Sequence, residues 1–446
     1  MKTGLFRIGN LIEAGLAGRK SAAKLKKLQS EKLRKLLSHA CRFVPLYRRR
    51  FNELGLRPDE FRDPADLVKL PTLSKEELRD TPLIETMAEN VSRADCVEVT
   101  TSGSTGRPLR MYYTRKDFSR LNMNWLRPLF AHGVKPWYKK LEISGPHNLP
   151  PGKKWYQHLG LMRSRGISIF RPPGEWVDAW RSGRPDFLYG YSGSLKLLAR
   201  YVLETGVDDI RPRFVFGVSD LVDEECRELI PAAFSRPMID LYGAAETGCI
   251  AWECPGCRGY HLNMDTVLVE YLRDGRPAPP GTPGRLVVTN LHSFAMPIIR
   301  YELEDIGTAS ELNPVCGRGL PLMKIIEGRS DAFIVLPSGE VLSPMFFFGL
   351  MKTIAGIRHW KVMQSESGRL EIAIVPAREF SSDTVKQIKQ RVQDKSGEKM
   401  EIRIKVGQCI PPDSSGKVRA VVSQVKKKMG KDRQGESIIP QYSFDA

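Results

Sequence analysis

The stretch from residue 139 to 243 constrains the fold most, because short apolar runs alternate there with helical stretches. The apolar runs are KKLEIS (139–144), PDFLYGY (185–191), RFVFGVS (213–219) and MIDLYG (238–243). A helical pattern, SLKLLARYVLE, follows the second of them. Strands that alternate with helices form layered α/β domains with a largely parallel sheet. The sequence therefore predicts an α/β domain around this stretch.

The segments before and after this stretch predict different kinds of structure. Leucines at helical spacing predict helices in the first 50 residues, and Ser74 ahead of two glutamates predicts another helix start. From about residue 266 to 327, strand-like runs are split by DG, PP and PG turn signals, which favours antiparallel hairpins.

The last section, after about residue 328, has the pattern of a small α+β lid. LEIAIV (370–375) reads as a strand, and SDTVKQIKQRVQDKS (382–396) reads as a helix. A chain of 446 residues is too long for one ordinary core. We therefore expect a large N-terminal domain over 1–327 and a smaller, mobile C-terminal domain with a basic tail over 328–446.

The formal charge of +18 raises the question of an anionic partner. Much of the excess lies in residues 20–35 and 417–433. Basic segments are usually solvated faces or tails, and no recognised nucleic-acid module accompanies them. They also suit ATP, the phosphates of coenzyme A or an acidic carrier protein. Nucleic-acid binding is therefore a minor alternative.

The chain has no apolar run long enough for a membrane helix, which needs roughly 20 residues. Arg7 and Glu13 interrupt the apolar start, so we interpret the first 20 residues as a docked helix instead of a signal peptide. Most of the eight cysteines are widely scattered, which argues against a disulfide framework. We expect a cytoplasmic protein without a membrane span.

Three segments have residues suited to a nucleotide. TTSGSTGRP (100–108) combines glycines with hydroxyl and cationic side chains that can surround phosphate oxygens, although it is not a Walker P-loop. In YGAAETG (242–248), the ring of Tyr242 beside Gly243 can lie along a purine, and Glu246 can bind Mg²⁺. In IIRYELEDIG (298–307), Asp305 is expected just after a strand, as an acceptor for ribose hydroxyls.

Two further segments lie toward the C-terminus. GRSD (328–331) falls at the expected domain junction, and PPDSSGKVR (411–419) has flexible flanks that would let Lys417 swing into a closed site. There its charge would neutralise the phosphate and carboxylate. Each of the five segments alone has an ordinary alternative as a surface loop, a turn or a surface lysine.

Together, in this order, the five segments resemble the adenylate-forming superfamily, and more closely the phenylacetate–CoA ligase family with its capsule-cluster relatives. HACRFVPLYRRRF (39–51), PDFLYGYSGSLKLLA, ECPGCRGYH and VCGRGLPLMKIIEGRSD also resemble that family. The resemblance extends from about residue 30 to 425. It implies an enzyme that uses ATP to convert a carboxylic acid, such as an aryl or arylacetic acid, into an acyl-adenylate. The acyl group would then pass to a thiol, with coenzyme A as the main candidate.

The same resemblance implies a role for each motif residue. The phosphate-binding residues would be Thr101, Ser102, Gly103, Ser104, Thr105, Gly106 and Arg107. Tyr242 would contact adenine, and Glu246 would bind Mg²⁺. The remaining roles fall to Asp305 and Arg329 at the ribose, Asp331 at the hinge, and Lys417 in adenylation. The C-terminal domain would rotate between the two half-reactions.

One position departs from the superfamily pattern. Ala245 stands where a Ser or Thr usually contacts the α-phosphate, which removes one hydrogen bond worth about 0.5–1.5 kcal/mol. Two alternative functions stay open, and the second of them draws on Ala245 and the basic tails. The first is an adenylating enzyme that transfers the acyl group to a carrier protein, an amine or a polysaccharide. The second is an inactive homologue that binds a nucleotide or nucleic acid.

A candidate zinc site is formed by Cys254, Cys257, His261 and Cys316. Three sulfurs and one imidazole suit tetrahedral Zn²⁺, and four protein ligands leave no open position, so such a metal would be structural. Relatives with a zinc site in this region commonly have a cysteine where Pro314 stands, so Cys257 would take its place. The alternative is a set of reduced cysteines without a metal.

The acid-binding pocket is expected to come from the middle of the chain. The candidates are His147, Asn148, Tyr189, Tyr191, Phe216 and Gly217. Aromatic residues at such positions are more often part of the core than of a pocket.

Overall fold

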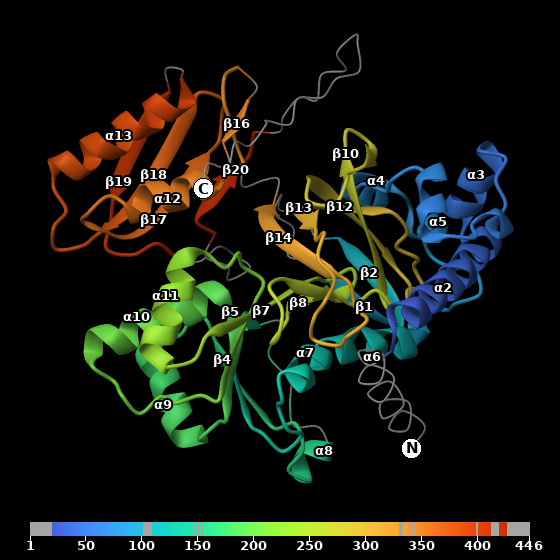
Figure 1. The fold of residues 1–446 in the computed structure, drawn as a ribbon, viewed down its shortest axis with the longest axis horizontal. Coiled ribbons are helices and arrows are strands. Elements are labelled where there is room, and N and C mark those ends of the chain that lie inside the picture. The colour runs from blue at the N-terminus through green and yellow to red at the C-terminus, as the bar shows by residue number, and fades with distance from the viewer. Residues whose placement is uncertain are drawn as a thin grey trace. The chain divides into compact units, whose positions relative to one another are not determined.

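The computed structural model describes residues 20–100, 109–146, 149, 152, 155–329, 333–338, 340–342, 344–397, 400–411 and 419–425 (Figure 1). The chain forms two compact units. Unit 1 takes its described residues from Met1–Tyr138 and Ile239–Ile326, and unit 2 from Lys139–Met238 and Glu327–Ala446. The helix expected within the first 20 residues lies almost wholly outside the described residues.

Unit 1 begins with helices, and the first two that the structure describes are those that the leucine spacing predicts within the first 50 residues. The helices are α2 (Ala22–Phe43), α3 (Pro45–Glu53), α4 (Lys75–Asp80) and α5 (Leu83–Thr86), with short 3₁₀ turns at Pro58–Glu60, Pro64–Lys69 and Arg93–Asp95. Pro45 stands in the first turn of α3, where its missing N–H costs no helical hydrogen bond. The Ser74 side chain accepts a 3.0 Å bond from the Glu77 backbone N–H, which confirms the predicted helix start.

A hairpin and two helices follow in unit 1. The hairpin strands are β1 (Cys96–Thr100) and β2 (Arg110–Thr114), and the helices are α6 (Arg115–Asn124) and α7 (Leu126–Ala131). Thr100 pairs with Arg110 at the end of the hairpin. The strands therefore bring together Thr100 and Arg110 on either side of residues 101–108, which lie outside the described residues.

The sheet of unit 1 has the strand order β11-β10-β12-β13-β14-β9-β8-β7. Its strands are β7 (Met238–Ala244), β8 (Gly248–Glu253), β9 (Tyr260–Leu262), β10 (Val267–Arg273), β11 (Arg276–Pro277), β12 (Pro283–Asn290), β13 (Tyr301–Ala309) and β14 (Leu322–Arg329). The neighbours β10–β12 and β12–β13 pair antiparallel. This confirms the hairpins predicted from the turn signals.

The core of unit 1 joins its helical start to this sheet. Leu36 of α2, Phe51 of α3 and Val288 of β12 are fully buried in one apolar cluster. Tyr47 adds a polar link, because its hydroxyl donates a 2.9 Å bond to the Pro297 carbonyl. Burial of each large apolar side chain stabilises the fold by about 1.5–3 kcal/mol.

Unit 2 contains a parallel sheet, as the alternating pattern predicts, although its strand over Ser164–Ser168 was not predicted. The strand order is β6-β5-β3-β4, with β3 (Lys140–Ser144), β4 (Ser164–Ser168), β5 (Phe187–Tyr191) and β6 (Phe214–Val218). All three pairings are parallel. The helices of this part are α8 (Trp155–His158), α9 (Pro173–Gly183), α10 (Ser192–Thr205) and α11 (Glu224–Phe234). Helices α9 and α10 contact the sheet, and α11 packs on α10 (Figure 1).

The C-terminal part of unit 2 has its own sheet and core. Its elements are β15 (Ile334–Val335), β16 (Val341–Leu342), α12 (Pro344–Lys352), β17 (Ile357–Gln364), β18 (Arg369–Pro376), α13 (Ser382–Ser396), β19 (Glu401–Val406) and β20 (Val421–Ser423). The larger sheet has the order β19-β18-β17-β20. Phe347, Val362 and Ile388 are fully buried in a separate apolar cluster. The predicted α+β pattern is confirmed, whereas the exact boundary at 327/328 stays a prediction.

Within the described part of the chain, no helix has both the length and the apolar character that a bilayer crossing requires.

Candidate active site

The YGAAETG segment forms a tight turn between β7 and β8, and its glycines are required by packing. The register of the two strands shifts between Tyr242 and Gly243. A Cβ atom on Gly243 would lie 2.4 Å from the Gly248 carbonyl oxygen and 2.6 Å from the Trp125 ring. Gly248 has φ of +74°, a left-handed conformation that glycine adopts without strain. The hairpin therefore has no room for larger residues at these positions.

Two predicted nucleotide-binding residues meet beside this turn. The hydroxyl of Tyr242 donates a 2.6 Å hydrogen bond to Oδ2 of Asp305. Asp305 lies inside β13, so the expectation that it follows a strand is wrong. The register of β12 and β13 shifts near this point, and Glu304 has φ of +63°. An irregular strand of this kind redirects its side chains, here toward β7.

Glu246 is held at both its backbone and its side chain. Its carbonyl oxygen accepts bonds from the Tyr113 hydroxyl (2.9 Å) and from Nδ2 of Asn290 (2.8 Å). Its Oε1 accepts a 3.2 Å bond from the Tyr301 hydroxyl. Burial, reinforced by the charge of Glu246, raises the pKa of Tyr113 well above its ordinary value, so Tyr113 remains a donor.

These three partners of Glu246 were not predicted from the sequence. Tyr113 ends the buried run of β2, and Asn290 ends β12. Neither position has a local signal that points to Glu246. Only Tyr301 lies within one of the predicted nucleotide-binding segments, IIRYELEDIG, and there the predicted site residue was Asp305.

A buried ion pair stabilises the β7–β8 hairpin through Asn263. The guanidinium nitrogens Nη1 and Nη2 of Arg127 donate to Asp265, at 2.7 and 2.8 Å, and Nη1 also donates to Asn263. Burial raises the pKa of Asp265, but the Arg127 charge outweighs it and the pKa is lowered. Asn263 in turn donates a 2.9 Å bond to the Cys249 carbonyl. The start of β8, next to the turn, is thereby fixed.

The other predicted nucleotide-site residues are not described. Thr101–Arg107, Asp331 and Lys417 lie outside the described residues. Strand β14 ends at Arg329, of which only the backbone is described.

The four predicted zinc ligands come together in unit 1. One ligand atom from each of Cys254, Cys257, His261 and Cys316 lies within 4.8 Å of the others. Nε2 of His261 is 3.0 Å from Sγ of Cys254 and 3.1 Å from Sγ of Cys316. Strand β9 places His261, and a turn closed by the 3.0 Å bond from the Cys254 N–H to the Gly259 carbonyl precedes it.

Two members of this cluster, His261 and Cys316, have pKa values that favour metal binding, whereas burial raises the pKa of Cys254 to about 12. Burial lowers the pKa of His261 to about 4, so its imidazole is neutral near pH 7. Its Nδ1 lies 3.0 Å from the Leu320 carbonyl, which leaves Nε2 directed at the sulfurs. Burial raises the pKa of Cys316, but hydrogen bonds from the backbone and side chain of Arg318 outweigh it and bring the pKa to about 7. Three sulfurs with one neutral imidazole fit Zn²⁺.

The residues expected to line an acid pocket fall into different environments within unit 2. Tyr191 and Phe216 are buried core residues. At Gly217 a Cβ atom would lie 2.6 Å from Oγ of Ser192, so this glycine permits close packing. Tyr189 is half-buried, with Nζ of Lys140 4.6 Å from its ring centroid. His147 and Asn148 lie outside the described residues.

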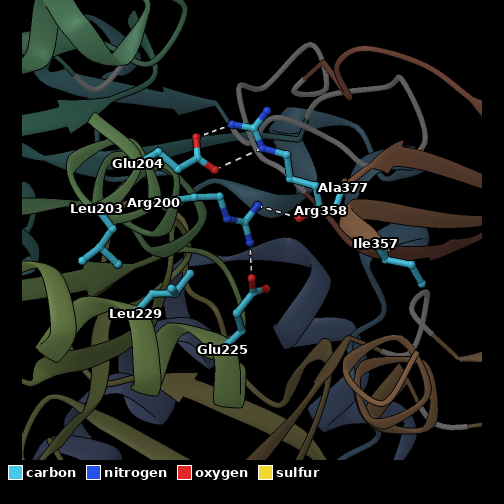
Figure 2. Close-up of a pocket in the computed structure, with 8 residues that line it drawn as sticks. All are labelled: Arg200, Leu203, Glu204, Glu225, Leu229, Ile357, Arg358 and Ala377. Atoms are coloured by element: carbon cyan, nitrogen blue, oxygen red, sulfur yellow. Dashed lines mark hydrogen bonds and ion pairs between the residues drawn. The ribbon is translucent and has the colours of Figure 1, made fainter. Parts of the chain in front are cut away.

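Unit 2 also contains an open pocket of about 420 Å³ that none of the predicted site residues lines. Figure 2 shows that Arg200 donates to Glu225 and to the Arg358 carbonyl, and that Arg358 pairs with Glu204. Both guanidinium groups thus face carboxylates. The pocket wall is a seam of ion pairs that links α10 and α11 to β17, not an exposed anion site.

Comparison with known proteins identifies relatives over most of the chain. The family model named CapK C-terminal domain matches residues 334–424. Phenylacetate-coenzyme A ligase from Escherichia coli (strain K12) is 27% identical over 384 residues, which covers 84% of this chain and 86% of the relative. The enzyme of the same name from Pseudomonas putida is 30% identical over 327 residues, covering 70% and 72%.

Solved structures agree with these relatives at the level of the fold. 2-Hydroxyisobutyryl-CoA ligase in its postadenylation state matches with a TM-score of 0.74 at 18% identity, and 91% of each chain is covered. Anthranilate CoA ligase in complex with anthranoyl-AMP matches with a TM-score of 0.51 at 14% identity, over 74% and 67%. The predicted α/β fold with a separate C-terminal domain is therefore confirmed, and the chain belongs to the phenylacetate–coenzyme A ligase family.

Proposed function

We propose that this protein joins a carboxylic acid to coenzyme A in two steps. In the first, a carboxylate oxygen attacks the α-phosphorus of ATP, and pyrophosphate leaves. In the second, the thiol sulfur attacks the acyl carbon, the thiol proton is lost, and AMP leaves. The observation that carries this proposal is the bond between Tyr242 and Asp305, beside the turn that bears Glu246. The relatives are named as ligases of phenylacetate, which supports an aromatic acid as the substrate.

Each end of the nucleotide has residues suited to it. The ring of Tyr242 lies along adenine, and Asp305 accepts hydrogen bonds from the ribose hydroxyls together with Arg329. The bond from Tyr242 fixes the Asp305 carboxylate at the junction between base and sugar. The segment Thr101–Arg107 surrounds the β- and γ-phosphates. Its ends are set by the pairing of Thr100 with Arg110.

Charge on the phosphates would be balanced by the cation that Glu246 holds and by Lys417. Glu246 binds Mg²⁺, which when present neutralises phosphate oxygens. Lys417 stabilises the charge that develops on the α-phosphate and the carboxylate during adenylation. Asp331 acts as the hinge between the domains 1–327 and 328–446, and rotation there withdraws Lys417 before the thiol enters. Retention of this set favours catalysis in spite of Ala245.

The sulfur and imidazole cluster of Cys254, Cys257, His261 and Cys316 holds a structural zinc ion. Its support is the convergence of four ligand atoms within 4.8 Å. The metal would tie the turn before β9 to the segment before β14. Its position outside the hairpin of Tyr242 and Glu246 gives it no part in the chemical steps. We place the reaction in the cytoplasm, where ATP and coenzyme A are both available.

The decisive experiment measures acid-dependent ATP–pyrophosphate exchange by the purified protein across a panel of aryl, arylacetic and aliphatic acids. Exchange should require both Mg²⁺ and the substrate acid. Added coenzyme A should yield AMP and a thioester in equal amounts. Formation of ADP, or exchange with none of the acids, would exclude the proposed reaction. Hydroxylamine capture of the activated acid identifies the intermediate independently.

A further inference from the structure

Glu246 is buried and is held by hydrogen bonds at both its main chain and its side chain. Its side chain is only 7% exposed, and its backbone carbonyl accepts bonds from Tyr113 and Asn290. These two donors come from the ends of β2 and β12, which fix the turn between β7 and β8 from two directions. Two donors on the carbonyl hold the main chain, but they leave the rotation of the side chain open.

Tyr301 supplies the missing constraint on the carboxylate. It begins β13, is 1% exposed, and donates to Oε1 of Glu246 at 3.2 Å. Oε2 of Glu246 makes no hydrogen bond within the described residues, so the two carboxylate oxygens differ in their surroundings. Carboxylates that bind metal ions are themselves held by hydrogen bonds from neighbouring groups, which orient them as ligands.

Mg²⁺ makes strict demands on such a ligand. It requires near-octahedral geometry at about 2.0–2.1 Å and usually takes only one or two carboxylates besides water and phosphate oxygens. A glutamate free to rotate would have to lose that freedom when it binds the ion. A neighbouring donor that already fixes the orientation of the carboxylate therefore raises its affinity for the ion, although the donor itself does not contact the ion.

We infer that Tyr301 is a positioning residue for the divalent cation, acting through the carboxylate of Glu246. The inference rests on the proposed function of Glu246 as the Mg²⁺ ligand. It gives the strand of Asp305 a second role, because β13 then fixes the ribose acceptor with one residue and the metal ligand with another.

The test replaces Tyr301 by phenylalanine, which keeps the ring and removes the hydroxyl. Loss of an outer partner of a metal ligand typically costs 10–100-fold in metal affinity, so the Mg²⁺ concentration for half-maximal ATP binding should rise about 10-fold. Calorimetric titration of ATP at fixed Mg²⁺ concentrations measures this without turnover. In pyrophosphate exchange, the same shift should appear while the rate at saturating Mg²⁺ changes little.

Tyr271 provides a matched control, because its hydroxyl is also buried but has no hydrogen-bond partner among the described residues. Tyr271→Phe should leave the Mg²⁺ dependence unchanged. A second control uses Glu246→Gln as the background. If Tyr301 acts through Glu246, adding Tyr301→Phe there should produce no further shift.

The outcomes are distinct. An unchanged Mg²⁺ dependence in Tyr301→Phe, or an equal shift in the Glu246→Gln background, overturns the inference about Tyr301. A wild-type protein that binds no ATP and exchanges no pyrophosphate overturns the proposed function instead. Equal thermal unfolding midpoints for the two Tyr→Phe variants exclude a general loss of structure as the cause of a shift.

Discussion

The Tyr242 hydroxyl and Oδ2 of Asp305 lie 2.6 Å apart, although 63 residues of chain separate them. The bond couples β7 to β13, which are not neighbours in the sheet order. In the proposed complex it joins the residue beside adenine to the residue at the ribose. One hydrogen bond thus sets the spacing between the base and sugar ends of the nucleotide site.

Tyr242→Phe should weaken ATP binding while preserving the chemical step. A hydrogen bond contributes about 0.5–1.5 kcal/mol, so we expect the KM for ATP to rise roughly 2- to 10-fold with kcat nearly unchanged. Tyr260→Phe is the control, because its hydroxyl donates a similar 2.9 Å bond to Asp240 outside the proposed site. Initial-rate exchange kinetics measure both variants. Equal effects on ATP KM in the two would contradict the assignment of Tyr242.

Lys417→Ala should separate the two half-reactions. Loss of its charge removes stabilisation that exists only during adenylation, so acid-dependent pyrophosphate exchange should fall about 100-fold or more. Thioester formation from supplied acyl-adenylate and coenzyme A should stay largely intact. Lys405→Ala serves as the control, since Lys405 is an exposed cation of the C-terminal sheet that pairs with Glu371. If both half-reactions fell together, the rotation scheme would be wrong.

The purified protein should contain about one zinc ion per chain, as measured by mass spectrometry of the metal. Cys254→Ser should lose that zinc and lower the unfolding temperature, because four-ligand zinc sites stabilise the folded state directly. The control is Cys226→Ser, which changes a buried cysteine outside the cluster. It should retain the metal whatever its effect on stability. Wild-type protein purified without chelator and free of zinc would contradict the assignment.

The ion pairs around the pocket of Figure 2 should couple α10 to β17 measurably. Glu204→Arg and Arg358→Glu should each lower the free energy of unfolding of the protein. The double variant, which restores the ion pair with the charges exchanged, should recover part of that free energy. The side chains are nearly half exposed, so the coupling free energy should be about 0.2–1 kcal/mol and should shrink in 1 M salt. The exposed pair of Arg181 and Asp209 gives a control cycle within the same unit. Urea unfolding of the four variants measures the coupling, and a value independent of salt would exclude an electrostatic origin.

Regular elements and ligand clusters could be predicted from the sequence because their signals are local. The helix predicted over 382–396 has the bounds of α13, and β3, β5 and β6 lie where apolar runs placed them. Cys254, Cys257 and His261 are close in sequence, and only Cys316 had to be added from a distance. The ligase family was likewise predicted and is confirmed by the relatives.

The partners of Glu246 could not be predicted for the opposite reason. Tyr113 is 133 residues away and Asn290 is 44 residues away, and both contact the carbonyl of Glu246, a group that every residue has. Asp305 was expected just after a strand, as an acceptor for ribose hydroxyls. The structure keeps this residue in β13 by shifting the register. Such irregularities depend on the neighbouring strand and leave no pattern in one segment.

Trp125 fills the space that a side chain at Gly243 would occupy, and this limits how the enzyme can be re-engineered. A methyl group at 243 would have to displace the indole of α6–α7 or open the hairpin. Designs for a different acid should therefore leave residues 242–248 as they are. The turn over residues 242–248 behaves as a fixed part of the scaffold, which any variant should keep unchanged.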